Sequence, residues 1–116
     1  MEELIQAFKD KSFSLKQETI KAIEFENVHT EEVAYLLPYK EITVALNPVT
    51  VENYFLLKNA AKGLTHSTAL KRFPKRINTG ETPITYGYSF KFQSVEELSS
   101  FLREFNLLTA ELQDVI

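Results

Sequence analysis

The chain of 116 residues contains no cysteine, no tryptophan, one methionine and only three glycines. Without cysteine it can form no disulfide, no thiolate zinc site and no cysteine nucleophile. The glycines stand apart, at Gly63, Gly80 and Gly87, so the G-x-x-x-x-G-K-[ST] and G-x-G-x-x-G phosphate loops are both missing. A G-x-S-x-G nucleophile elbow is missing as well. These absences predict a protein that is not an enzyme, with no catalytic residues and no cofactor.

The sequence also lacks any long apolar run. Nowhere do about 18 apolar residues follow one another, so no membrane-spanning helix and no membrane partner are predicted. Residues 1–5 are acidic and then amphipathic, unlike the basic start of a secretory signal. The two histidines, His29 and His66, supply at most half of a zinc ligand set, so no metal site is predicted. We expect a cytoplasmic protein, and its oligomeric state stays open.

The composition is that of an ordinary globular domain, with 44% hydrophobic and 25% charged residues. A length of 116 residues fits a single domain that spans residues 1–116. Nine phenylalanines and five tyrosines provide most of the volume for one core.

Hydrophobic spacing in the first half of the chain predicts a helix followed by strands. Residues 1–10 are amphipathic with a helical period, and alternation places Ile23 and Phe25 on one face of a strand within residues 13–28. Residues 41–46 alternate in the same way, and Asn47-Pro48 ends that strand. Two stretches stay ambiguous: residues 33–37 fit a strand or a short helix, and residues 50–62 fit a helix capped by Thr50 or a strand.

The second half contains the clearest patterns. Gly63 and residues 65–68 indicate a break, residues 67–73 a single turn ended by Pro74, and residues 75–83 an exposed loop. Residues 84–92 alternate strictly and predict a strand. Ser94 begins a capping box, in which its hydroxyl binds the Glu97 amide and the Glu97 side chain returns to the Ser94 amide. A helix with a continuous apolar stripe follows, and Thr109 is a candidate cap for a last short turn.

This order of elements lacks the strand-helix alternation of a parallel doubly wound sheet. It predicts an α+β fold with an antiparallel or mixed sheet on which the N- and C-terminal helices pack. A sheet curled into a small barrel is the alternative arrangement.

The charges are unevenly distributed along the chain, although the net charge is only -3. Residues 1–40 carry eight acids and five bases, and residues 77–116 carry six acids and two bases. Between residues 53 and 80 there is no acid. That stretch holds six bases: Lys58, Lys62, Lys71, Arg72, Lys75 and Arg76.

The cationic stretch predicts a nucleic-acid site. Lys71, Arg72, Lys75 and Arg76 would contact RNA phosphates, with Lys58 and Lys62 as outer contacts and Phe73 as a ring that stacks on a base. Six phosphate contacts on a single strand predict a log-log salt slope near about -4. The competing interpretation is a solvated basic loop whose Phe73 anchors it to the core. Tyr86 and Tyr88 are either a stacking platform or, as their alternation favours, core residues.

The chain resembles the PrgU-like family of small proteins associated with Gram-positive conjugative plasmids. The resemblance spans nearly the whole chain and rests on its size, the acidic start at residues 1–5 and the run of residues 86–92 into the last helix. It implies a PUA-like β-barrel, RNA binding, and negative regulation of conjugation or surface-adhesin genes through their transcripts. It supplies no site motif.

The acidic ends of the chain support a second hypothesis of a different class. A protein-binding inhibitor or adaptor would present an acidic helix face to a basic partner.

Overall fold

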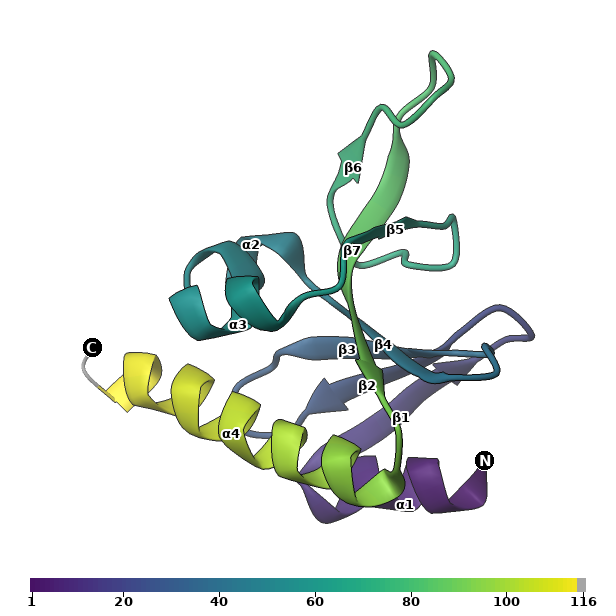
Figure 1. The fold of residues 1–116 in the computed structure, drawn as a ribbon. Helices are drawn as coiled ribbons and strands as arrows, with labels where there is room; N and C mark the ends of the chain where they lie inside the picture. The colour runs from purple at the N-terminus through teal and green to yellow at the C-terminus, as the bar shows by residue number, and fades with distance from the viewer. Residues whose placement is uncertain (115–116) are drawn as a thin grey trace.

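In a computed structural model, residues 1–114 are described and form an α+β fold (Figure 1). The predicted fold class is confirmed: an antiparallel sheet carries one helix from each end of the chain. The elements, in chain order, are α1 (Glu2–Asp10), β1 (Phe13–Glu18), β2 (Ile23–Asn27), β3 (Val33–Leu37), β4 (Ile42–Leu46), α2 (Pro48–Glu52), α3 (Phe55–Ala60), β5 (Leu64–His66), β6 (Lys75–Arg76), β7 (Ile84–Phe92) and α4 (Val95–Asp114).

The sheet runs in the order β1-β2-β3-β4-β7-β5, and every pairing is antiparallel. The long strand β7 pairs with β4 along residues 88–92 and with β6 along residues 84–85, while β5 pairs with residues 86–88. The sheet is not closed, so the barrel alternative, with the PUA-like barrel that the resemblance implies, is wrong for this arrangement. Closure would need β1 to pair with β5, but these strands lie at opposite ends of the order, and β5 has only three residues.

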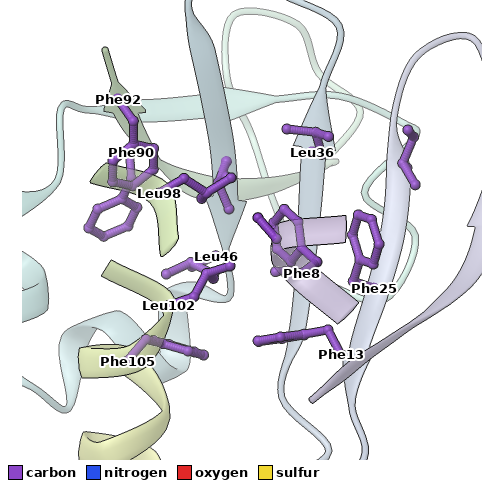
Figure 2. Close-up of a cluster of buried hydrophobic side chains, with 14 of the residues drawn as sticks. Phe8, Phe13, Phe25, Leu36, Leu46, Phe90, Phe92, Leu98, Leu102 and Phe105 are labelled. Carbon is purple, nitrogen blue, oxygen red and sulfur yellow. The ribbon is translucent and has the colours of Figure 1, made fainter. Parts of the chain in front are cut away.

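Helices α1 and α4 cover one face of the sheet, which we call the helix face. Phe8 of α1 stacks on Phe25 of β2 with 4.1 Å between ring centroids, and Leu102 and Phe105 of α4 are buried in the same cluster (Figure 2). The predicted amphipathic stripes of both helices are therefore the surfaces that pack on the sheet. Burial of such side chains contributes about 1.5–3 kcal/mol each to folding.

Helix α4 begins at the predicted capping box, with one partner shifted. The Glu97 amide donates to Ser94 Oγ at 3.1 Å, but the Glu97 carboxylate accepts from the amide of Gln93, not Ser94. The prediction that Thr109 caps a last short turn is also wrong. Its hydroxyl donates to the Phe105 carbonyl at 2.9 Å, one turn back, and α4 continues to Asp114.

We call the opposite face of the sheet the loop face. It is covered by residues 67–74. Leu70 and Phe73 of this loop pack with Tyr35 of β3 and Ala45 of β4 in a second buried cluster. Because both faces of β3 are covered, all five of its residues are buried. The predicted single turn at residues 67–73 is therefore an anchored cover of the sheet.

The ambiguous stretches resolve through local hydrogen bonds. Residues 33–37 form a strand because the Asn27 side chain accepts from the amides of His29 and Thr30, and Glu31 takes a φ of 67°, which closes a tight β2–β3 turn. Residues 48–60 form two short helices. Asn47, not Thr50, is the cap of the first, with Pro48 in its first turn.

Candidate nucleic-acid interface

Residues 64–88 include β5, β6 and the first half of β7, and we call this region the basic arm. It carries four of the predicted site cations: Lys71 and Arg72 in the 67–74 loop, and Lys75 and Arg76 on β6. Figure 1 shows its β6–β7 end extending beyond the rest of the sheet. Neither β5 nor β6 was predicted, because residues 65–68 were interpreted as a break and residues 75–83 as a loop. The pairing of both with β7 fixes the direction of the side chains on each.

Lys71 and Lys75 come together on the loop face. Their side chains line one hollow of about 240 Å³, together with Thr68, Pro83, Ile84 and Thr85. None of these lining residues is acidic, and both lysines are exposed. Two ammonium groups and a threonine hydroxyl around an open hollow are groups that bind a phosphate.

Arg72 is neutralised although it stands next to Lys71 in the sequence. Its guanidinium pairs with the carboxylate of Glu26 and lies 3.7 Å from that of Glu24, both on β2. The hydrogen bond from Arg72 lowers the pKa of Glu26 and raises that of Arg72 itself. Because two carboxylates face one guanidinium, Arg72 adds no net positive charge to the surface, and its predicted phosphate contact loses its electrostatic basis.

The backbone of Arg72 is held as well. Its amide donates to the Tyr35 hydroxyl at 3.0 Å, and that hydroxyl donates to Glu24 Oε1 at 2.8 Å. Burial raises the pKa of Tyr35 to about 12, so the phenol keeps its proton throughout the physiological range. Arg72, Tyr35 and the two glutamates thus form a clamp that holds the loop on the sheet.

Phe73 is buried, so its predicted role as a stacking ring for RNA is wrong in this conformation. Its side chain is 4% exposed and meets Tyr35 edge to face, with 4.9 Å between ring centroids. Gly87 of β7 makes room for it, since a Cβ there would lie 3.0 Å from Phe73 Cδ2 and 2.9 Å from the Leu46 carbonyl oxygen. The competing interpretation, in which Phe73 anchors the basic loop to the core, describes its position.

Arg76 lies on the opposite face of the arm from Lys75. Lys75 is directly opposite Thr85 and Arg76 directly opposite Ile84, so consecutive residues of β6 point to opposite sides. The Arg76 guanidinium sits 5.4 Å from the Tyr86 ring centroid. The six cations therefore do not meet in a single patch.

The outer contacts Lys58 and Lys62 are exposed and lie apart from the Lys71–Lys75 hollow. The Lys58 ammonium is 5.5 Å from the Tyr88 ring centroid, and the Tyr88 hydroxyl donates to Glu52 at 2.8 Å. Lys62 precedes β5, and its amide donates to the Ser89 carbonyl at 2.8 Å. Tyr88 packs partly against the core, which fits its interpretation as a core residue, whereas Tyr86 belongs to neither buried cluster.

Acidic residues gather at the far end of the molecule, where α1 meets the start of α4. Glu3 and Asp10 of α1 and Glu96 of α4 line a hollow of about 370 Å³. We call this surface the acidic end. Figure 1 shows α1 and the start of α4 at the opposite end of the fold from the β6–β7 end of the basic arm.

The residues whose side chains the structure describes bring together no group of three His, Asp or Glu that could hold a metal ion. Over the same residues, no helix has the length and apolar content required to cross a bilayer.

The sequence contained part of the signal for these rearrangements. Glu24 and Glu26 alternate with Ile23 and Phe25, so both carboxylates had to point away from the helix face. A count of charges along the chain could not show that these two carboxylates contact Arg72, almost fifty positions later. His66 was missed as a neighbour of Tyr86 because β5 was not predicted.

A scan against protein-family models and a search of curated proteins found no match to the chain.

Proposed function

We propose that the protein is a non-enzymatic regulator that binds RNA, with Lys71 and Lys75 contacting backbone phosphates. The observation that carries this proposal is the acid-free hollow that the two lysines share on the exposed loop face. Phosphate contacts provide most of the sequence-independent affinity for nucleic acids. Arg72 is excluded from the contact set by its carboxylate partners, and Phe73 by its burial.

The geometry changes the expected salt dependence. With Lys71 and Lys75 as the phosphate contacts, the log-log slope for a single strand becomes about -1.4, from about -0.7 per contact. The six contacts predicted from the sequence would give about -4. Fluorescence anisotropy with a labelled 20-mer of uridine across a salt series separates the two values.

The direct test is the double substitution Lys71→Gln and Lys75→Gln. We expect it to weaken binding to RNA of every sequence alike and to bring the salt slope closer to zero by about 1.4. The matched control removes two exposed charges outside the arm, at Lys9 and Lys40, and should leave the slope unchanged. Equal losses for both variants would show that net charge alone drives binding, and the proposed site would be wrong.

The resemblance to PrgU-like proteins supports a specific regulatory setting. We propose that the chain lowers expression of conjugation or surface-adhesin genes by acting on their transcripts. In a Gram-positive host that carries a conjugative plasmid, transcripts should fall when the wild-type chain is expressed and recover with the Lys71→Gln/Lys75→Gln variant. Repression that survives this substitution would contradict an action through the hollow.

The acidic end favours a second function, a module that binds a basic protein. Its warrant is the hollow lined by Glu3, Asp10 and Glu96, which concentrates negative charge between two helices. A pull-down should then recover one protein in stoichiometric amount after nuclease treatment. The substitutions Glu3→Gln, Asp10→Asn and Glu96→Gln together should abolish that recovery, whereas Lys71→Gln/Lys75→Gln should not affect it.

A further inference from the structure

The helix side of the basic arm carries a row of planar side chains that the phosphate proposal does not use. Tyr86 of β7 lies directly opposite His66 of β5, and their rings stack with 5.7 Å between centroids and 20° between planes. The Arg76 guanidinium of β6 lies 5.4 Å from the same tyrosine ring. Three adjacent strands thus present an imidazole, a phenol ring and a guanidinium side by side.

This row is open to solvent on its β6 side. Arg76 is exposed, and no carboxylate within residues 1–110 lies within ion-pairing distance of it. A cation–π contact is therefore the interaction that holds the guanidinium at Tyr86, and at an exposed site such a contact is weak, about 0.5–1 kcal/mol. A nucleobase can stack on the guanidinium plane, or it can displace the guanidinium and stack on the tyrosine ring, because both surfaces are flat.

The register of β6 connects this row to the phosphate hollow. β6 is two residues long, and β7 is its sole partner strand among the described residues. Lys75 points to the loop face and Arg76 to the helix face. A single strand that crosses the free edge of β6 would meet Lys71 and Lys75 on one side and the Arg76–Tyr86–His66 row on the other.

We infer that the row formed by Arg76, Tyr86 and His66 is a base-stacking site for an unpaired nucleotide of the same RNA whose phosphates lie at Lys71 and Lys75. This inference rests on the proposed function, because it needs a bound strand. It assigns the site a ligand class, single-stranded RNA with at least one unstacked base, and excludes a continuous duplex, whose bases are already stacked on one another.

Two probes test the inference: a 20-mer of uridine and an abasic 20-mer with the same phosphate backbone. The wild-type chain should bind the uridine strand about 10-fold more tightly, as expected for one stacked base. Tyr86→Leu should remove most of that preference and leave the affinity for the abasic strand and the salt slope unchanged. Tyr39→Leu, which removes an exposed tyrosine outside the arm, should preserve the preference.

Arg76 supplies an independent readout. Arg76→Lys keeps the charge but loses the plane, so the salt slope should stay the same while the preference for uridine falls by about 3-fold.

The two proposals fail in different ways. If neither strand binds the wild-type chain, the proposed function is wrong and the stacking site with it. If both strands bind equally, or if Tyr86→Leu weakens both to the same extent, the stacking site is overturned while the phosphate site stands.

Discussion

The two faces of the sheet are held by different kinds of structure. On the helix face, α1 and α4 bury apolar stripes from two long elements, including Phe8, Leu102 and Phe105. On the loop face, a segment of eight residues without regular structure is held by two apolar side chains, Leu70 and Phe73, and by the clamp of Arg72 with β2 and β3. The helix face is held by apolar contacts spread over two helices, whereas the loop face depends on a few specific ones.

This difference explains where charge can be displayed. A helix that packs through one stripe leaves its other side free. The exposed acids on that free side are Glu2, Glu3 and Asp10 of α1 and Glu96, Glu97 and Glu104 of α4. The 67–74 loop is held on the sheet by some of its own side chains. Because one of these is Arg72, whose charge is neutralised by Glu24 and Glu26, the basic arm retains only part of its positive charge. One of its two arginines, Arg72, has a structural role, and Lys71 and Lys75 remain for a ligand.

The largest expected effect tests whether the loop face depends on one ring. Phe73→Ala should lower the free energy of unfolding by about 3–5 kcal/mol, because it removes a buried aromatic side chain and leaves a cavity beside Tyr35. Urea denaturation followed by circular dichroism measures the change. The control Phe55→Ala removes a ring that is 77% exposed and should change stability by at most about 0.5 kcal/mol. An unchanged midpoint for Phe73→Ala would show that the ring does not anchor the loop.

A smaller effect is expected when an atom is added next to the Phe73 ring instead of the ring being removed. Gly87→Ala places a Cβ within 3.0 Å of Phe73 and 2.9 Å of the Leu46 carbonyl, so overpacking should cost about 1–3 kcal/mol. Combining it with Phe73→Leu should relieve part of that cost, which a double-mutant cycle detects as non-additivity. Strict additivity of the two changes would contradict direct contact between these positions.

The Arg72 clamp should contribute modestly and depend on pH. Because the Arg72 guanidinium is 45% exposed, Arg72→Ala should cost at most about 1 kcal/mol at neutral pH, whereas Lys71→Ala should cost nothing measurable. The pKa of Glu26 is lowered in the folded state, so the clamp's contribution is present above the ordinary glutamate pKa. It is lost as the pH falls through the lowered value. Thermal unfolding of both variants between pH 7 and pH 3 checks the direction of this pH dependence. The difference in unfolding midpoint between Arg72→Ala and Lys71→Ala should shrink on acidification, and a difference that widens would refute the clamp.

The smallest effect concerns Glu32, a carboxylate whose pKa shifts in the opposite direction to that of Glu26. Burial raises the pKa of Glu32, whose Oε1 accepts a hydrogen bond from Thr50 Oγ1 at 2.8 Å. Its charged form is therefore disfavoured in the folded state, and stability should decrease as the pH rises through its pKa. Glu32→Gln keeps the acceptor without the charge, so it should be at least as stable as wild type at pH 7. Unfolding midpoints at pH 5 and pH 7 test this, and a clear loss of stability at pH 7 would contradict the burial argument.

Local patterns were sufficient wherever an element contains its own signals. The strand at residues 84–92 has strict alternation, and the helix after Ser94 has both a cap and a stripe, so both were predicted correctly. β5 and β6 were missed because strands of three and two residues have no periodicity to detect. They exist because the unpaired edges of β7 offer backbone partners, and that information lies in β7.

The fold class, the apolar faces of the terminal helices and the concentration of bases between residues 53 and 80 could all be predicted from the order of the residues. Which of those bases are available to a ligand depends on how the chain folds. Ion pairs and strand register join residues far apart in the chain, so Glu24 and Glu26 neutralise Arg72 across the sheet, and β6 directs Lys75 and Arg76 to opposite faces. A count along the chain measures how charge is distributed in the sequence, whereas binding depends on the unpaired charge that the fold gathers on one surface.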